Sequence, residues 1–400
     1  MIIENKEVKV EAGKFLEVTG PAAVRVKEGE ALLMGKPLET NDLVVVPQWR
    51  TYVIKATKDC VLSISLTKET VVNIVDSNVF EVWTKNLEKL VDFERVVIAG
   101  PTDSGKSSVT ATLLNLNLRY GKEISVIDSD VGQNNLCYPT MVCKTRVRDF
   151  VFMLSDLEGE EKRFTGTITP ALHTSRVISS VSSLVKGKVV VDTDGWVDGY
   201  DAGYYKHSLL RAVEPDAVVY MGKAPWWAKG PWELVELPPS PGKERNREDR
   251  RSIRKNKYRK VLEKCKSLDV DLRRVPVLYS VLFTSPEGDE ALKEAVKELI
   301  GVKPLMVVTH NKKIIAVVPK RSKYRKVKEV EVIEEGEERG LLVGLGDGKG
   351  NEEIGMVVRI DFKNKILKVK SCFDRELSYV SFGSVKLDED FSDHVWRKPI

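Results

Sequence analysis

The first part of the chain consists of short apolar runs in which polar residues alternate with β-branched ones. The runs, separated by Gly, Pro, Asn and Asp signals, are KEVKVEAG, AAVRVKEG, DLVVVPQW, TYVIKAT and CVLSISLT. Side chains of a strand alternate between its two faces, so short runs of this kind indicate half-buried strands joined by turns. The pattern predicts an N-terminal β-sandwich-like domain over residues 1–85.

The pattern changes near Asn86. Apolar runs now alternate with helical stretches, and these runs are RVVIAG, ISVIDSD, KVVVDTD, DAVVYMG and VPVLYS. Such alternation is typical of an α/β domain with a largely parallel sheet, which we expect over residues 86–302. Strand-like segments return after residue 303 as MVVTHNKKIIAVV, GLLVGLGD, GMVVRIDF and ILKVKSCF. They predict a C-terminal β-rich domain over residues 303–400.

Charge is unevenly distributed along the chain. The net charge is +5, whereas residues 243–266 hold twelve Lys or Arg against four Asp or Glu, so this segment carries +8 and the rest sums to −3. A basic partner surface is therefore local. The five cysteines form no CxxC pair and are odd in number, which argues against a disulfide framework and a zinc site and favours a reducing cytoplasm. No apolar run is long enough for a signal peptide or a membrane helix, so no membrane partner is expected.

A phosphate-binding motif follows the apolar run RVVIAG. The sequence from Gly100 to Ser107 fits G-x-x-x-x-G-K-[ST], and SSVTATLLNLNLRY after it reads as a helix that Gly121 ends. Glycines let backbone N–H groups surround phosphate oxygens, the lysine reaches the β and γ phosphates, and the serine hydroxyl binds Mg²⁺. The predicted nucleotide-binding residues are Gly100, Pro101, Thr102, Asp103, Ser104, Gly105, Lys106, Ser107 and Ser108. No N-K-x-D motif or LSGGQ-like signature occurs, so ATP is the expected nucleotide.

Carboxylates end two of the apolar runs. Asp128 and Asp130 close ISVIDSD, and we expect them on one face of a strand end, because residues two apart point the same way. Carboxylates beside a phosphate loop can hold Mg²⁺ and accept a proton from an attacking hydroxyl. The predicted metal site comprises Ser107, Asp128 and Asp130. Asp192, which ends VVVD, is an open alternative to Asp128 as the acid nearest the metal.

Four motifs follow one another along the chain: GPTDSGKSS, then DVGQ with Pro139 six residues after its glutamine, then FTGTITP, then DTDGWVDG. In this order they resemble the polynucleotide 5′-hydroxyl kinases of tRNA splicing, pre-mRNA cleavage and ribosomal RNA processing, with their archaeal counterparts. The arginine-rich segment 245–259 stands in the place of the family's lid. The resemblance covers about residues 95–260, and the family's three-domain architecture implies the two β-rich flanks. Asp194 departs from the pattern, since a small residue is commoner before the Gly-Trp pair.

The resemblance implies roles for individual residues. Lys106 and Ser107 would handle the triphosphate and magnesium, Asp130 would be the general base for the RNA 5′-hydroxyl, and Trp196 would stack on the terminal base. The predicted substrate-binding set is Gln133, Thr167, Thr169, Pro170, Trp196, Arg250 and Arg254. Protein partners in RNA processing are left open, as are the oligomeric state and DNA as a further acceptor.

The basic segment also carries its own signal. Arg247, Arg250, Arg251 and Arg254 have the spacing i, i+3, i+4, i+7, which on a helix forms one cationic face. The arginine fork binds phosphate oxygens bidentately and keeps its charge, so we expect Arg247 and Arg251 to act catalytically with Lys106 and Asp130. A solvated charged helix is the alternative for this segment. A packing role is the alternative for Trp196, and a structural role is favoured for His173.

Together these features predict an ATP- and Mg²⁺-dependent kinase that phosphorylates RNA 5′-hydroxyl ends. The alternative from another class is a non-catalytic subunit that binds ATP and serves as a scaffold in an RNA-processing complex. Phosphoryl transfer needs charge stabilisation and an oriented nucleophile, and Lys106, Asp130 and the arginine face would supply both.

Overall fold

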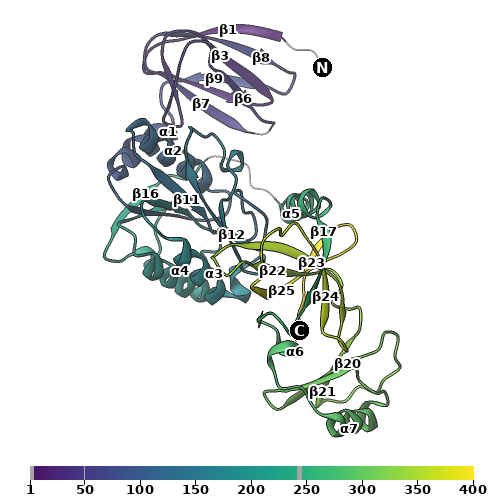
Figure 1. Cartoon of the computed structure of the whole chain (residues 1–400). Coiled ribbons are helices and arrows are strands. Elements are labelled where there is room, and N and C mark those ends of the chain that lie inside the picture. The colour runs from purple at the N-terminus through teal and green to yellow at the C-terminus, as the bar shows by residue number, and fades with distance from the viewer. Residues whose placement is uncertain (1–3, 49, 241–245) are drawn as a thin grey trace. The chain divides into compact units, whose positions relative to one another are not determined.

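A computed structural model describes residues 4–48, 50–240 and 246–400 (Figure 1). The chain divides into two compact units, and each contains more than one segment of the sequence. The first unit comprises residues 1–128, 145–158 and 185–244, and the second comprises residues 129–144, 159–184 and 245–400. The three domain ranges expected from the sequence stay predictions.

The N-terminal part of the first unit is made of two antiparallel sheets. Their strands are β1 (Glu4–Val10), β2 (Phe15–Thr19), β3 (Ala22–Glu28), β4 (Ala31–Leu33), β5 (Lys36–Leu38), β6 (Leu43–Val46), β7 (Thr51–Ala56), β8 (Cys60–Leu66) and β9 (Val71–Val75). The strand orders are β1-β8-β3-β6 and β5-β4-β7-β2-β9. Alternate residues of β3 and β8 are buried, as a strand with one covered face requires. The strand-rich character that the sequence predicts is confirmed here.

The rest of the first unit is built around parallel strands in the order β11-β14-β10-β15-β16. The elements are α1 (Val79–Leu87), η1 (Glu88–Leu90), β10 (Arg95–Ala99), α2 (Lys106–Arg119), β11 (Ile124–Asp128), η2 (Leu154–Asp156), β14 (Val189–Asp192), α4 (Tyr200–Val213), β15 (Ala217–Met221), η4 (Trp226–Ala228) and β16 (Glu233–Leu237). Strands β10, β14 and β15 are almost wholly buried, which explains their continuous Val-rich runs.

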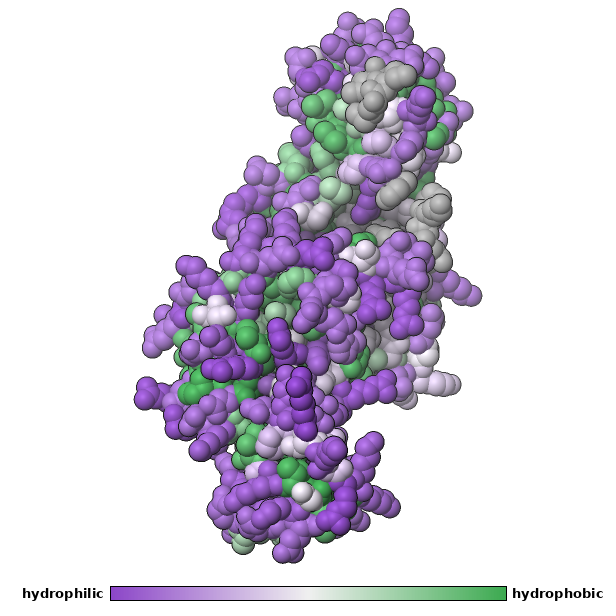
Figure 2. Space-filling view, turned by 90° about the vertical axis from the view of Figure 1, so that its right-hand side faces the viewer, coloured by the Kyte–Doolittle hydropathy of each residue, from purple (hydrophilic) through white to green (hydrophobic). Residues whose placement is uncertain are grey.

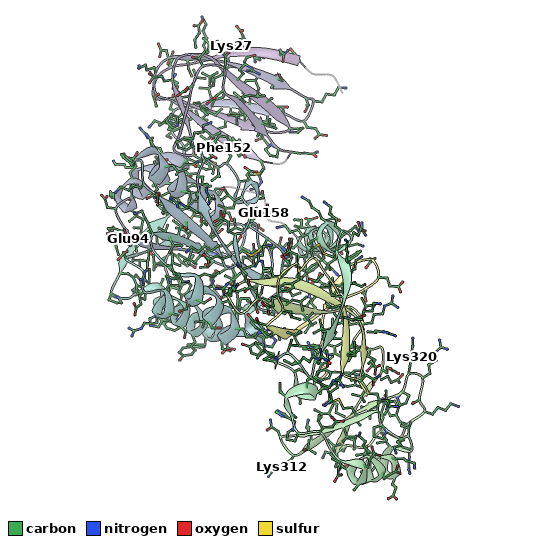
Figure 3. All side chains as sticks on the ribbon, viewed as in Figure 1. Lys27, Glu94, Phe152, Glu158, Lys312 and Lys320 are labelled. Carbon is green, nitrogen blue, oxygen red and sulfur yellow. A yellow bond between two sulfur atoms is a disulfide. The ribbon has the colours of Figure 1, made fainter. Side chains whose placement is uncertain are left out.

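Contacts within the first unit join its N-terminal sheets to the helical part. The Phe152 ring, labelled in Figure 3, lies 6.0 Å from the Tyr52 ring, and the Lys36 ammonium lies 5.6 Å from the centroid of Phe152. The buried Asn115 amide of α2 donates to the backbone oxygens of Met34 and Val151 at 2.9 and 2.8 Å. Helix α2 is buried on nearly all sides, and this explains why its sequence lacks a polar face.

The second unit begins with an antiparallel strand pair and the helices that follow it. Its first elements are β12 (Met141–Val147, with residues 145–147 in the first unit), β13 (Glu161–Phe164), η3 (Pro170–Leu172), α3 (Thr174–Leu184) and α5 (Arg247–Leu262). Met141 of β12 pairs with Phe164 of β13 in antiparallel register. The strands between residues 86 and 302 are therefore mixed in direction.

The C-terminal sheet of the second unit has the order β17-β24-β23-β22-β25-β18, with β26 beside β25. Its strands are β17 (Lys266–Asp271), β18 (Val277–Leu278), β22 (Leu341–Gly346), β23 (Glu352–Asp361), β24 (Ile366–Ser371), β25 (Tyr379–Leu387) and β26 (Asp393–Val395). The prediction that VPVLYS belongs to the α/β sheet is wrong, because β18 pairs with β25. An apolar run shows burial but does not reveal which sheet provides its partner.

A smaller sheet in the order β19-β20-β21 completes the second unit. The remaining elements are α6 (Val281–Thr284), α7 (Glu290–Ile300), β19 (Met306–His310), β20 (Lys313–Val318) and β21 (Val330–Glu334). Val296 and Ile300 of α7 pack with Val307 and Ala316 in a separate apolar cluster. Helix α7 begins at an Asp289 cap, whose side chain accepts from the Leu292 N–H, and it ends at Gly301 with φ 82°.

Two disulfides, Cys137–Cys143 and Cys265–Cys372, contradict the expectation that the cysteines form no disulfide framework. Cys60 is the fifth cysteine and is buried and unbonded. An odd count is the reason for that expectation, but one spare cysteine does not prevent the other four from pairing.

The face in Figure 2 is mostly hydrophilic, and no helix in the described part of the chain is long and apolar enough to cross a membrane.

Candidate active site

The phosphate loop runs from the end of β10 to the start of α2. Its backbone adopts positive φ at Gly100 (150°), Asp103 (57°) and Gly105 (99°). A Cβ at Gly105 would lie 2.9 Å from the Trp83 ring and 2.9 Å from the Ser240 side chain, so both conformation and space require glycine. Helix α2 begins at the next residue, Lys106, and its N-terminal backbone N–H groups favour a bound anion.

Two side chains of the phosphate loop form hydrogen bonds with the backbone of the same loop. The Lys106 Nζ donates to the Pro101 oxygen at 2.6 Å, and the Ser104 Oγ donates to the same oxygen at 2.8 Å. Lys106 is 8 % exposed, so its charge lies within the loop and not on the surface. Thr102 is exposed, and Asp103 and Ser108 are half-buried. A cation held among backbone N–H groups is suited to the oxygens of a triphosphate.

Ser107 contacts the acid that the sequence left as an alternative. Its Oγ donates to the Asp192 Oδ2 at 2.8 Å, and Asp192 is opposite Asp128 in the parallel register of β14 and β11. Both carboxylates are buried, Asp192 at 2 % and Asp128 at 0 % exposure. A hydroxyl and a carboxylate are hard oxygen donors of the kind that Mg²⁺ binds, so these residues fit that ion. Within residues 4–48, 50–240 and 246–400, no three His, Cys, Asp or Glu side chains gather as a metal site.

The Trp196 loop follows β14 and lies against the phosphate loop. The Thr193 Oγ1 donates to the Ile98 oxygen of β10 at 2.9 Å, and a Cβ at Gly195 would lie 2.7 Å from the Thr102 nitrogen. Trp196 is half-buried, and its ring stacks with Tyr205 of α4, with centroids 5.7 Å apart and planes at 22°. The close approach at Gly195 thus brings the Trp196 loop beside the phosphate loop.

Asp130 does not share a strand face with Asp128, and that expectation is wrong. Strand β11 ends at Asp128, and Asp130 lies in the turn beyond it. The Asp130 Oδ1 accepts the backbone N–H groups of Gly132 at 3.0 Å and Gln133 at 2.8 Å. The carboxylate thereby fixes its own turn, as Asp side chains commonly do at such positions. The Gln133 Nε2 donates to the Gly132 oxygen at 2.9 Å and to the Arg250 oxygen of α5 at 3.3 Å.

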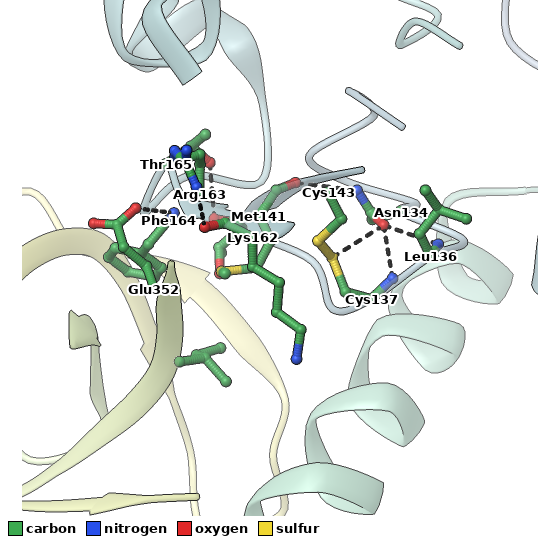
Figure 4. Close-up of a disulfide and its surroundings, with 12 residues drawn as sticks. Asn134, Leu136, Cys137, Met141, Cys143, Lys162, Arg163, Phe164, Thr165 and Glu352 are labelled. Atoms are coloured by element: carbon green, nitrogen blue, oxygen red, sulfur yellow. Dashed lines mark hydrogen bonds between the residues drawn. A yellow bond between two sulfur atoms is a disulfide. The ribbon is translucent and has the colours of Figure 1, made fainter. Parts of the chain in front are cut away.

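The loop after Gln133 is closed by the Cys137–Cys143 disulfide (Figure 4). The Asn134 Oδ1 accepts from the backbone nitrogens of Leu136 at 3.0 Å and Cys137 at 2.9 Å. The Asn134 Nδ2 donates to the Met141 oxygen at 3.1 Å. The Lys257 ammonium of α5 donates to the Asn134 backbone oxygen. The disulfide loop is thus one of the places where α5 docks in the second unit.

The segment Gly166–Pro170 is ordered by two internal hydrogen bonds and by strand β25. The fully buried Thr167 donates its Oγ1 to the Thr169 oxygen at 2.7 Å and accepts the Thr169 N–H at 3.2 Å, which makes a tight turn before η3. The Ser384 backbone nitrogen donates to the Gly166 oxygen at 2.8 Å, and a Cβ at Gly166 would lie 2.6 Å from the Gly383 Cα. The C-terminal sheet therefore sets the position of this segment.

His173 and Arg176, which follow Gly166–Pro170, also face β25. The His173 Nε2 lies 3.0 Å from the Ser384 Oγ, and the structural role favoured for His173 stays a prediction. Burial, followed by the Arg176 charge, lowers the pKa of His173. The Arg176 guanidinium donates to the Phe382 oxygen at 3.0 Å and stacks 3.9 Å from the Tyr279 ring centroid. Burial lowers the pKa of Arg176 to about 10.

The arginine-rich segment forms the predicted helix, α5, from Arg247 to Leu262, and residues 243–245 of the predicted lid lie outside the described residues. Asn246 caps the helix by accepting the Asp249 N–H at 2.8 Å. The four arginines do not share one environment, because Arg247 and Arg251 are exposed while Arg250 and Arg254 are half-buried.

Arg254 and Tyr258 dock α5 onto the end of the chain. The Arg254 Nη2 lies 3.0 Å from the Asp393 Oδ2 in an ion pair whose acid is fully buried. Tyr258 is 0 % exposed, and burial raises the pKa of its hydroxyl well above the ordinary value. Arg254 is therefore committed to a structural contact in this conformation, and its predicted contact with RNA stays a prediction.

The predicted site residues thus fall into two groups. The first unit holds the phosphate loop with Asp128 and Trp196, and the phosphate loop meets the Trp196 loop at Gly195. The second unit holds Asp130, Gln133, Thr167, Thr169, Pro170, Arg247, Arg250, Arg251 and Arg254. Gln133 and Arg250 are in contact there.

Comparison with known proteins agrees with this geometry. Residues 100–264 match the family model described as mRNA cleavage and polyadenylation factor CLP1 P-loop. A polyribonucleotide 5′-hydroxyl-kinase of Pyrococcus abyssi is 26 % identical over 328 residues, which cover 76 % of this chain and 91 % of that protein. One of Thermococcus kodakarensis is 27 % identical over 331 residues, with coverage of 76 % and 92 %. The chain is thus similar to archaeal polyribonucleotide 5′-hydroxyl-kinases over about three quarters of its length.

Solved structures of Clp1p have a similar fold. A structure of an extended interface between Pcf11p and Clp1p aligns with a TM-score of 0.60 over 96 % of this chain and 99 % of that chain, at 13 % identity. At that identity the likeness shows the fold alone. The polyribonucleotide 5′-hydroxyl-kinase Clp1 of Danio rerio is 28 % identical over 189 residues, which cover 41 % of this chain and 42 % of that protein.

Three residues that sequence reasoning did not assign to the site stand out in the structure. Asp192 is only an alternative in the sequence prediction, although it ends a buried strand next to β10, at the carboxyl end of the strands where such sheets bind ligands. Tyr205 and Lys206 belong to none of the predicted sets, yet both contact the Asp194 carboxylate at 2.9 Å. A buried lysine within an amphipathic helix cannot be told from a surface lysine by sequence spacing, so no signal was available for Lys206.

Proposed function

We propose that this protein transfers the γ-phosphate of ATP to the 5′-hydroxyl end of RNA. The observation that carries the proposal is an intact phosphate loop, with Lys106 and Ser107 held in place, in a chain that aligns over three quarters of its length with archaeal polyribonucleotide 5′-hydroxyl-kinases. The relatives supply the reaction class, and the loop supplies the means to bind the donor. DNA as an acceptor stays a prediction.

Ser107, Asp192 and Asp128 would hold Mg²⁺ beside the triphosphate. This proposal rests on the Ser107–Asp192 hydrogen bond of 2.8 Å and on the pairing of Asp192 with Asp128 across adjacent strands. When bound, the ion would neutralise charge on the phosphate oxygens. Asp192 replaces Asp130 in the metal set predicted from the sequence, because its carboxylate already meets the loop serine.

Asp130 would act as the general base for the RNA 5′-hydroxyl. Its Oδ1 is used by the turn, where it accepts two backbone N–H groups. A carboxylate fixed by such hydrogen bonds has one defined orientation, which a positioned base requires. Thr167, Thr169, Pro170 and Gln133 would contact the nucleotides near the acceptor, and Trp196 would stack on the terminal base.

Arg247 and Arg251 are the arginines that we assign to the migrating phosphoryl group. Both are exposed on the N-terminal half of α5, whereas Arg254 is paired with the buried Asp393. An exposed arginine can reach a ligand without first breaking an ion pair. The planar guanidinium can donate two parallel hydrogen bonds to phosphate oxygens.

The test offers γ-labelled ATP with a short 5′-hydroxyl RNA, beside the same RNA already 5′-phosphorylated, to wild type and to Asp130→Ala. The proposal predicts label on the hydroxyl-ended RNA alone, and a loss of about 100- to 10,000-fold in the variant, as for removal of a general base. ATP affinity should stay unchanged in the variant, because Asp130 is outside the phosphate loop.

Other outcomes would favour other functions. ATP binding without label transfer would favour the scaffold that binds ATP statically in an RNA-processing complex. Label released as free phosphate regardless of RNA would indicate an ATPase. Equal labelling by wild type and Asp130→Ala would leave the kinase intact and remove Asp130 as its base.

A further inference from the structure

A buried ion pair lies directly beneath the Trp196 loop. The Lys206 Nζ of α4 is 2.9 Å from the Asp194 Oδ2 and also donates to the Asp194 backbone oxygen at 2.8 Å. Asp194 is 4 % exposed and Lys206 is 1 % exposed. Two opposite charges in such a place are weak evidence for stability, because their desolvation offsets their attraction. Their geometric effect on the loop is therefore the more informative property.

The Asp194 carboxylate contacts both Trp196 and the tyrosine that stacks on it. Its Oδ1 accepts the Trp196 backbone N–H at 2.9 Å, and its Oδ2 accepts the Tyr205 hydroxyl at 2.9 Å. Tyr205 is 3 % exposed, and its ring stacks with the indole of Trp196. One carboxylate thus fixes both the backbone that carries the indole and the ring that supports it.

The phosphate loop limits the same segment from the other side. Gly195 lies so close to Thr102 that a Cβ would come within 2.7 Å of the Thr102 nitrogen. Trp196 is therefore held between the phosphate loop, which is assigned to the donor, and the buried ion pair of Asp194 with Lys206 of α4. A loop held on both sides keeps the Trp196 ring in one defined place beside the phosphate loop.

We propose that Asp194 and Lys206 are positioning residues, which orient Trp196 for stacking on the 5′-terminal base of the acceptor RNA. The inference rests on the proposed function, in which Trp196 contacts RNA. Lys206 holds the carboxylate, the carboxylate holds the Trp196 N–H and the Tyr205 hydroxyl, and Tyr205 supports the indole. Neither Asp194 nor Lys206 needs to touch RNA or ATP.

The test uses a short 5′-hydroxyl RNA with 2-aminopurine as its first nucleotide, since stacking on an indole quenches the fluorescence of that base. Wild type is compared with Trp196→Ala, Asp194→Ser and Lys206→Met. Each of the three variants is expected to lose most of the quench and to raise the RNA KM about tenfold, the scale of one lost base stack. The kcat at saturating RNA and the affinity for ATP should change little.

Two further variants separate positioning from general structural damage. Lys188→Met removes a lysine just before β14, the strand that ends two residues before Asp194, where its ammonium donates to the Val91 and Phe93 oxygens at 2.7 and 2.5 Å. It should leave the quench and the RNA KM at wild-type values. The double variant Asp194→Asn with Lys206→Met removes both charges but keeps an oxygen that can accept the Trp196 N–H. It should recover most of the quench.

Three results would overturn the inference, and they differ in what else they affect. A wild-type quench and RNA KM in Asp194→Ser and Lys206→Met, with loss only in Trp196→Ala, would remove the two positioning residues and leave the kinase standing. A wild-type quench in Trp196→Ala would also remove Trp196 from the acceptor site. Absence of label transfer by wild type itself would contradict the proposed function.

Discussion

Two short segments of the candidate site, the phosphate loop and Gly166–Pro170, are held in opposite ways. In the phosphate loop, Lys106 and Ser104 both donate to Pro101, which is at most five residues away. The Gly166 oxygen instead accepts from Ser384, which is 218 residues away, and Gly383 leaves no room beside it. The loop carries most of its geometry within its own sequence, whereas Gly166–Pro170 receives its position from the C-terminal sheet.

The largest effect is expected from a substitution in the phosphate loop, whose geometry is determined locally. Lys106→Met keeps the length of the side chain and removes the charge that would face the triphosphate. Loss of one charge-stabilising donor should reduce phosphoryl transfer about 100- to 1,000-fold, or about 3 to 4 kcal/mol. Initial rates with labelled ATP measure this. Lys27→Met, at an exposed lysine of β3 (Figure 3), is the control and should match wild type. Activity within threefold of wild type for Lys106→Met would show that the loop lysine does not serve the reaction.

Gly383→Val tests the distant support of Gly166–Pro170. A Cβ at Gly383 would lie 3.0 Å from both the Cα and the oxygen of Gly166, so valine has to displace one segment. Overpacking of this kind should lower the free energy of unfolding by up to about 3 kcal/mol. The RNA KM should rise while the affinity for ATP stays the same, as kinetics and nucleotide titration would show.

The control for Gly383→Val is Ala316→Val, which introduces the same side chain at a buried position of β20 in the smaller sheet. It should cost stability without raising the RNA KM. If both variants raise the RNA KM equally, the effect comes from general destabilisation and the two segments do not differ as described.

Opening the loop that the Cys137–Cys143 disulfide closes should have an intermediate effect. Replacing Cys137 and Cys143 by Ser opens a short loop, and loop-closure entropy predicts a loss of about 2 kcal/mol in the free energy of unfolding. Urea denaturation without reductant measures it, and Cys60→Ser, at the unbonded cysteine, controls for loss of a thiol. An unchanged unfolding free energy would show that the disulfide does not constrain the loop in solution.

The smallest effect concerns the pH dependence of the contact between His173 and β25. Burial and the Arg176 charge lower the pKa of His173 from its ordinary value near 6.5, so the folded state favours the neutral ring. The unfolded state binds the proton more readily, and stability should therefore fall as the pH decreases from about 6.5 through the lower folded pKa. His173→Gln should reduce that fall, which urea denaturation at pH 5 and pH 7.5 can detect. An equally steep fall in the variant would assign it to other groups.

The difference between the two segments also explains what the sequence could predict. The run RVVIAG, the glycine spacing and the helix after Lys106 predict the loop correctly, because the backbone conformation there depends on residues close in sequence. The helix of the arginine segment is correct for the same reason. Asp130 was placed on a strand because the run ISVIDSD does not reveal that β11 ends at Asp128 and that the carboxylate caps a turn.

Contacts over long sequence distances were beyond reach of the sequence alone. The docking of Gly166 on Ser384, the pairing of Arg254 with Asp393 and the pairing of Lys206 with Asp194 all depend on tertiary packing. Periodicity reports which residues are buried, but it does not report what buries them. The assignment of VPVLYS to the wrong sheet has the same origin, since any sheet can cover an apolar run.

The central claim is that the protein phosphorylates the 5′-hydroxyl of RNA, and the most direct test removes only that hydroxyl, which is the nucleophile. Two RNAs of identical sequence, one with a 5′-hydroxyl and the other with a 5′-deoxy terminus, are offered to the wild-type protein with γ-labelled ATP and Mg²⁺. A 5′-hydroxyl kinase transfers label to the first RNA and none to the second. Label on both RNAs, or label released only as free phosphate, would contradict the account.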